Sequence, residues 1–81
     1  MSARLRASVR DELRRRGIEP GPGDAPEALR ERLNDVYLEQ VRALRARQAA
    51  GEIPLRDYAG AAQSLKESFP LLGLPLALWV E

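Results

Sequence analysis

Arginines near the start of the chain form the pattern in this sequence that most resembles a binding site. The first three are spaced four residues apart and two more follow directly: Arg6, Arg10, Arg14, Arg15 and Arg16. On a helix, residues four apart lie on the same side, so the row offers a line of guanidinium groups to the phosphates of a nucleic acid or to another anion. The alternative is a solvated helix flank, whose charge Asp11 and Glu12 balance in part.

Acidic side chains form a second regular row, in which Glu31, Asp35 and Glu39 follow one another at intervals of four residues. Carboxylates bind hard metal ions, but a row along one straight helix supplies no converging ligands. Arg32 and Arg42 are also close enough in sequence to pair with it. We therefore interpret the row as a solvated face and predict no metal ion and no cofactor.

The residues that most enzymes use for acid–base or nucleophilic catalysis are missing. The sequence has no histidine and no cysteine, which removes the commonest general base, the usual zinc ligands and the thiol nucleophile. A Ser-His-Asp triad is excluded for the same reason. Tyr37 and Tyr58 fall on faces expected to be buried, where an aromatic ring belongs to a core more often than to a reaction. We predict that the protein is not an enzyme.

Length and charge limit the remaining choices. A chain of 81 residues forms one domain, near the size at which a single core leaves only a few kcal/mol of net stability. The 13 basic and 12 acidic residues give a net charge of +1, so a nucleic-acid or membrane surface would have to be recognised by a local patch. Association with another subunit is a ready way to complete so small a core.

The first element expected is an N-terminal helix from about residue 3 to residue 16. Leu5, Val9 and Leu13 recur every four residues, and Gly17 stands where a left-handed C-cap would lie. Residues 18–24 then contain Pro20-Gly21-Pro22-Gly23, which cannot continue a helix. This stretch has neither phosphate-binding glycine motif, so we interpret it as a connector.

An antiparallel helical hairpin is predicted for residues 25–69, with helices at about 25–50 and 54–68. Asp24 is expected to cap the first helix and Pro26 to occupy its first turn, while Gly51 ends it. The face of the first helix expected to be buried carries Leu29, Leu33, Val36, Tyr37, Ala43 and Leu44. The matching stripe of the second helix is Leu55, Tyr58, Ala61, Ala62, Leu65 and Phe69. The chain is therefore predicted to be all-α.

Residues 44–69 resemble the helical hairpins of the SHOCT family, the short C-terminal domains. The similarity lies in Gly51 and Ile53 at the corner, an aromatic at Tyr58, and Leu44 and Leu65 in the two helices. Pro54 and Arg56 depart from the family pattern, and the chain continues beyond the second helix. The resemblance implies an oligomerisation or interaction module without catalytic residues. The chain as a whole resembles small bacterial proteins.

An apolar tail, residues 70–81, follows the hairpin. Read as an extended segment, it places Leu72, Leu74, Leu76, Leu78 and Val80 on one side and Trp79 on the other. A solvated tail of this composition would promote aggregation, so it must be covered. It packs on its own helices, pairs with a second subunit, or enters a membrane surface through Trp79.

These features favour a small structural protein that associates with itself, as a homodimer, or docks on a larger protein. The predicted contact residues lie on the outer side of the long helix and in the tail: Leu38, Val41, Leu72, Leu74, Leu76, Leu78 and Trp79. The second choice is a nucleic-acid-binding accessory protein that uses the arginine row. No segment is long and apolar enough to span a membrane, so a cytoplasmic protein is expected.

Overall fold

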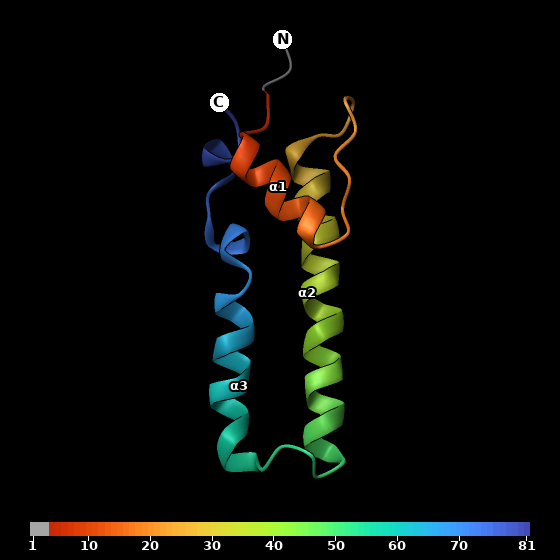
Figure 1. Ribbon diagram of the computed structural model, residues 1–81, viewed down its shortest axis with the longest axis vertical. Helices are drawn as coiled ribbons and strands as arrows, with labels where there is room; N and C mark the ends of the chain where they lie inside the picture. The colour runs from red at the N-terminus through yellow and green to blue at the C-terminus, as the bar shows by residue number, and fades with distance from the viewer. Residues whose placement is uncertain (1–3) are drawn as a thin grey trace.

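The computed structural model describes residues 4–81, which form three α-helices followed by two short 3-10 turns. The helices are α1 (Ala7–Arg15), α2 (Pro26–Ala49) and α3 (Leu55–Glu67), and the turns are η1 (Pro70–Gly73) and η2 (Leu76–Leu78). Figure 1 shows α2 and α3 side by side and antiparallel, with α1 across one end of the pair. Within the described range there is no strand, only one isolated bridge, and the all-α class is confirmed.

The first helix begins later than the sequence suggests. The predicted start at residue 3 lies outside the described residues, and Arg4 to Arg6 precede the helix, with Arg6 as an extended N-cap (φ −63°, ψ 144°). Leu5 instead forms an antiparallel bridge with Val80, and the Arg6 amide donates to the Trp79 carbonyl at 3.0 Å. Pairing with the end of the chain thus takes the segment that the periodicity assigned to the helix.

The end of α1 follows the prediction closely. Gly17 has a φ of +80°, and the Gly17 and Ile18 amides donate to the carbonyls of Arg14 and Leu13 at 3.0 and 2.9 Å. This is the bond pattern of a Schellman cap, in which a glycine takes the left-handed position. The cap turns Ile18 inward, where it is buried with Leu13.

The start of α2 differs from the prediction in one respect. Pro26 occupies the first helical position, but the N-cap is Ala25 and no side chain caps the helix. The Asp24 carboxylate is used inside the preceding loop, where its Oδ2 accepts from the Gly21 amide at 2.8 Å and lies 3.6 Å from Arg32. Asp24 therefore stabilises the turn of the Pro/Gly loop, and the capping prediction is wrong.

The corner between α2 and α3 repeats the cap seen after α1. Gly51 has a φ of +82°, and the Gly51 and Glu52 amides donate to Gln48 and Arg47 at 3.0 and 2.9 Å. Pro54 then serves as the N-cap of α3. At the other end, α3 stops at Ser68, since a residue before proline disfavours helical geometry and Phe69 has a ψ of 63°.

The apolar tail is folded and not extended, which corrects the prediction. Pro70 is the first residue of η1 and Pro75 is the N-cap of η2, so each proline starts a turn. The side chains of the tail therefore do not alternate between two sides. Trp79 is completely buried, and its Nε1 donates to the Leu74 carbonyl at 3.2 Å. The tail therefore packs on its own helices, which is the first of the three predicted coverings.

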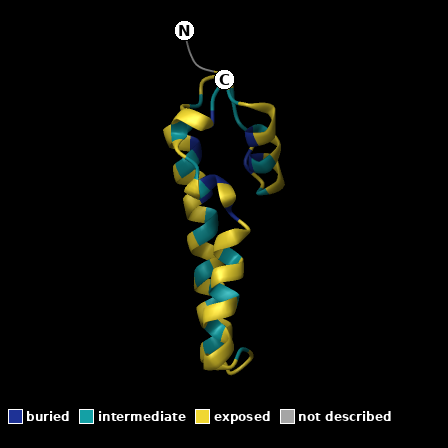
Figure 2. Ribbon diagram, turned by 90° about the vertical axis from the view of Figure 1, so that its left-hand side faces the viewer, coloured by how far each residue is buried: buried dark blue, intermediate teal, exposed yellow. Residues whose placement is uncertain are grey.

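The core lies entirely at the end of the molecule where α1 and the tail meet α2. Its buried members are Val9, Leu13, Ile18, Leu29, Leu33, Phe69, Leu71 and Trp79. Figure 2 shows the buried positions confined to this end, while the rest of the hairpin is half-buried or exposed. The molecule is correspondingly elongated, at 51 × 17 × 16 Å. Among residues 4–81, no helix has the length and apolar character needed to cross a membrane.

Two glycines with open space around them should respond oppositely to alanine. Gly51→Ala forces a side chain into a left-handed conformation and should destabilise the protein by about 1–2 kcal/mol. Gly60→Ala, in the interior of α3, should stabilise it by about 0.5–1 kcal/mol. Urea unfolding followed by circular dichroism measures both. Equal shifts of the two midpoints would contradict the assignment of Gly51 as the helix stop.

Burial of Trp79 should matter far more than burial of its neighbour in sequence. Trp79→Ala removes a fully buried side chain and should lower the free energy of unfolding by about 3–5 kcal/mol. Leu78→Ala removes a leucine that is 44% exposed and serves as the matched control, with an expected loss below about 1 kcal/mol. Similar losses in thermal unfolding would mean that the tail is not part of the core.

Candidate functional site

The predicted arginine row does not stay together in space. The Arg6 Nε donates to the Val80 carbonyl at 3.0 Å, so this side chain ties the start of the chain to its end. Arg14 binds the carboxylate of Glu19 through Nε and Nη2, with distances of 3.1 to 3.2 Å. Arg15 Nη2 lies 3.2 Å from Glu12. Most of the row is thus engaged within the chain.

Arg16 is a structural residue that fastens α1 to the end of α3. Its guanidinium carbon lies 4.0 Å from the centre of the Phe69 ring, in the position for a cation–π contact, and Nη2 donates to the Ser68 carbonyl. The Nε lies 3.4 Å from Glu12 Oε1, close enough for ion pairing but not aligned for a hydrogen bond. These contacts leave Arg16 little freedom to meet an external anion.

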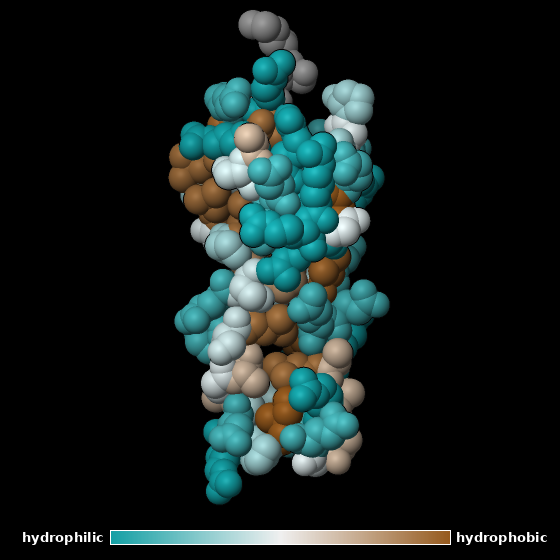
Figure 3. Space-filling view, viewed as in Figure 1, coloured by the Kyte–Doolittle hydropathy of each residue, from teal (hydrophilic) through white to brown (hydrophobic). Residues whose placement is uncertain are grey.

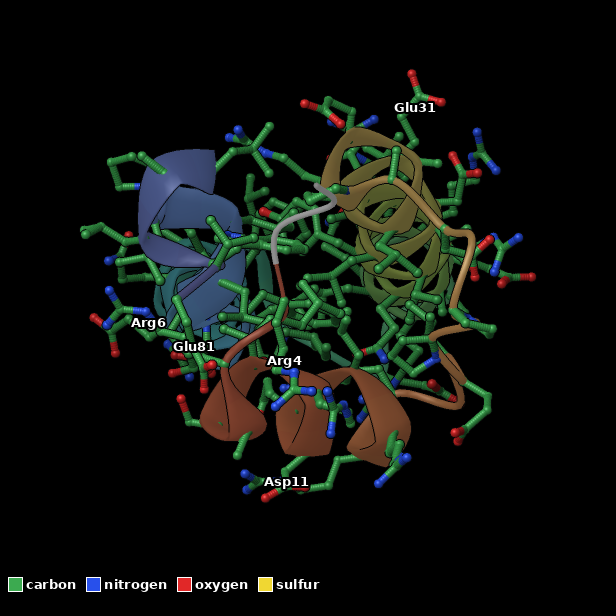
Figure 4. All side chains as sticks on the ribbon, turned by 90° about the horizontal axis from the view of Figure 1, so that it is seen from above. Arg4, Arg6, Asp11, Glu31 and Glu81 are labelled. Atoms are coloured by element: carbon green, nitrogen blue, oxygen red, sulfur yellow. The ribbon has the colours of Figure 1, made fainter. Side chains whose placement is uncertain are left out.

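A different set of arginines gathers in one place. Arg4, Arg10 and Arg14 line a groove of about 540 Å³ between α1 and the Pro/Gly loop, whose far wall is Pro20 to Pro22 with Asp24. Figure 4 shows Arg4 above α1, on the side of the molecule that α1 covers. Helical spacing could not place Arg4 here, because the residue precedes α1 and is held by the Glu81 amide, which donates to the Arg4 carbonyl at 2.8 Å. We call this the arginine groove.

The tail leucines named as contact residues serve mainly the core of their own subunit. Leu72, Leu74 and Leu76 are half-buried against the buried cluster, and Leu78 is 44% exposed. Trp79 is 0% exposed, so it is not available to a partner or a membrane surface in this fold. The prediction of Trp79 as a contact residue is corrected, because the turns of the tail direct the ring inward.

On α2, the two predicted contact residues remain accessible. Leu38 is 40% exposed in the middle of the helix, and Val41 is half-buried one turn further on. Leu38 lies opposite the face that the hairpin buries, as the helical period predicts.

Leu55 is an exposed residue that sequence reasoning missed. The helical period placed it in the buried stripe of the second helix, but it is 74% exposed. The reason is its position in the first turn after the corner, beyond the reach of α1 and the tail. The sequence does contain a signal of this exposure, because Leu55 directly follows Pro54 at the far end of the hairpin. A residue of an apolar stripe is buried only where another element packs against it.

The far part of the hairpin is loosely filled. A hollow of about 240 Å³ opens between the two helices, lined by Gln40, Ala43, Leu44, Arg47 and Leu65. Figure 3 shows hydrophobic residues between α2 and α3 below α1. No residue of α3 is buried, and those buried in α2 are Leu29 and Leu33. From residue 34 to residue 68, therefore, the described chain has no fully buried side chain.

The acidic row on α2 lies on an exposed, straight helix. Glu31, Asp35 and Glu39 are all solvent-exposed, and within residues 4–81 no three acidic side chains come together as a metal site. The arrangement therefore provides charge along a surface.

Comparisons with protein-family models, with curated proteins and with solved structures found no match to this chain. The resemblance of residues 44–69 to SHOCT hairpins stays a prediction made from those residues.

Proposed function

We propose that this chain is a non-catalytic structural protein that works by association, with α2, the corner and α3 as its contact element. The observation that carries the proposal is the absence of any buried side chain between residues 34 and 68 of the described chain. Apolar residues are present there, among them Val41, Leu44, Leu65 and the exposed Leu38 and Leu55. Their burial is what a partner would add.

The physical argument is that two helices alone cannot enclose a core. Ordering each residue costs about 1–2 kcal/mol of backbone entropy, and helices in proteins are held mainly by packing of their apolar face. In a four-helix bundle, two further helices complete that packing. The far part of the hairpin has the lengths and stripes of such a half-bundle, and the SHOCT resemblance is consistent with this interpretation.

Of the two predicted partners, a second copy of the chain is favoured over a larger protein. The reason is that the outer side of α2 carries acidic residues in its first half and arginines in its second half: Glu27, Glu31, Asp35, Arg42 and Arg45. Such a surface is complementary to itself when reversed. We also propose that the protein is located in the cytoplasm.

A second candidate function rests on the arginine groove. Arg4, Arg10 and Arg14 line one concave surface, and arginine binds phosphate through paired hydrogen bonds. A nucleic-acid contact is the form that this candidate takes. Glu19 and Asp24 reduce the local charge, which is why association is placed first.

Association predicts a mass that rises with concentration above the 9.0 kDa of one chain. Light scattering measures the mass, and amide hydrogen exchange at high and low concentration locates the contact. Dilution should speed exchange in α2 and α3, because those amides lose their cover. Amides of α1 provide the internal control. A mass of one chain at every concentration would overturn the proposal.

Binding through the arginine groove predicts a salt-dependent shift of a short DNA duplex, because released counterions drive such contacts. Arg10→Glu should abolish the shift at low salt. Arg56→Glu makes the same change of charge at an exposed position of α3, away from the groove and from the outer face of α2, and should leave most of the binding. Equal losses in the two variants would indicate unspecific attraction, and no binding at low salt would end this candidate.

A further inference from the structure

The outer face of α2 is the surface from which the inference starts. Residues seven or eleven apart return to within about 20° of the same direction on a helix, so five residues share this face: Glu27, Glu31, Leu38, Arg45 and Ala49. Asp35 and Arg42 lie on the same margin of this face, about 60° and 40° from Leu38. Figure 4 shows Glu31 pointing away from the molecule, on the side opposite α1. Apart from Leu38 and Ala49, every residue in this set is charged.

The charges on this face are separated along the helix. Glu27, Glu31 and Asp35 precede Leu38, whereas Arg42 and Arg45 follow it, and Leu38 stands near the midpoint of Pro26–Ala49. All five charged side chains are exposed. None takes part in the ion pairs within residues 4–81, which join Arg14 to Glu19, Arg15 and Arg16 to Glu12, Arg32 to Asp24, and Arg47 to Glu52. The face therefore carries a charge pattern that the chain itself leaves unmatched.

We infer that a second copy of the chain packs on this face in antiparallel orientation, with the twofold axis at Leu38. This inference rests on the proposed function and specifies its partner; of the apolar residues named there, the contact covers Leu38. Reversing the helix about Leu38 sets Glu31 opposite Arg45 of the second copy, and Asp35 beside its Arg42. A parallel pair would set each acid against the same acid, and like charges that face each other across a contact are unfavourable.

The surroundings of the acidic half fit the same occupant. Glu27, Glu31 and Asp35 border a groove of about 570 Å³, whose other wall is formed by Leu72 and Leu76 of the tail. Arg30 also lines this groove, and its Nη2 donates to the Leu72 carbonyl at 3.1 Å. In the antiparallel arrangement, the second half of the other α2 lies over this groove. Arginine suits this position because its long apolar stem can cover leucine while its guanidinium meets a carboxylate.

Charge and apolar contact have different roles in this interface. Exposed ion pairs contribute little to affinity, but complementary charge determines which orientation is accepted. Leu38, which meets its own counterpart at the axis, supplies apolar burial at the centre of the contact, where it is shielded best from water. The charges thus select the antiparallel orientation, and the hydrophobic contacts hold the two copies together.

Disulfide crosslinking tests the orientation directly, since the native chain contains no cysteine. Leu38→Cys should form a crosslinked dimer with itself under mild oxidation, because the two Cα atoms meet at the axis. Glu31→Cys and Arg45→Cys should each stay monomeric alone and crosslink when mixed. Glu39→Cys lies at the height of Leu38 but about 100° around the helix, and serves as the exposed control that does not crosslink.

The possible outcomes separate this inference from the proposed function. Crosslinks of Leu38→Cys with itself and of the mixed pair establish the antiparallel contact. Self-crosslinking of Glu31→Cys alone would indicate a parallel pair and overturn the inference. A chain that light scattering finds dimeric but that forms none of these crosslinks uses another face, which also overturns the inference and leaves the proposed function in place. A chain that is monomeric by light scattering overturns both.

Discussion

The structure depends on the burial of Trp79, because this contact joins the two ends of the chain to the start of α2. The Trp79 carbonyl accepts from the Arg6 amide, and Leu5 pairs with Val80 beside it. A helix of nine residues such as α1 is marginal in isolation. Docking against a covered tryptophan and two leucines of α2 gives α1 the surface that its narrow apolar stripe requires.

Because the core is concentrated at one end of the molecule, the other end is incompletely buried. The residues that cover α2 come from α1 and the tail, and neither segment reaches the middle of the helix. The hairpin beyond residue 34 is therefore held only by the pairing of its two helices and by the corner at Gly51. Because it has few buried contacts, this part has the lowest local stability of the described chain. A segment that is ordered but incompletely buried gains most from a second subunit.

The two groups of arginines illustrate how tertiary contacts divide residues of one type between roles. Around α1, Arg6 contacts the tail and Arg16 contacts Phe69, so most of the arginine row predicted to bind anions holds the fold together. On α2, Arg42 and Arg45 have no intramolecular ion pair within the described chain. The charge available to bind a partner therefore lies mainly on α2 and in the arginine groove.

Local rules were enough to predict the helices, their stops at Gly17 and Gly51, and the end of α3 before Pro70, because caps and prolines act on immediate neighbours. The exposed position of Leu38 also followed from the helical period. The exposure of Leu55, the burial of Trp79 and the gathering of Arg4 with Arg10 did not follow. Each of these depends on how far a covering segment reaches in space, and periodicity states which residues share a face without stating what lies opposite it.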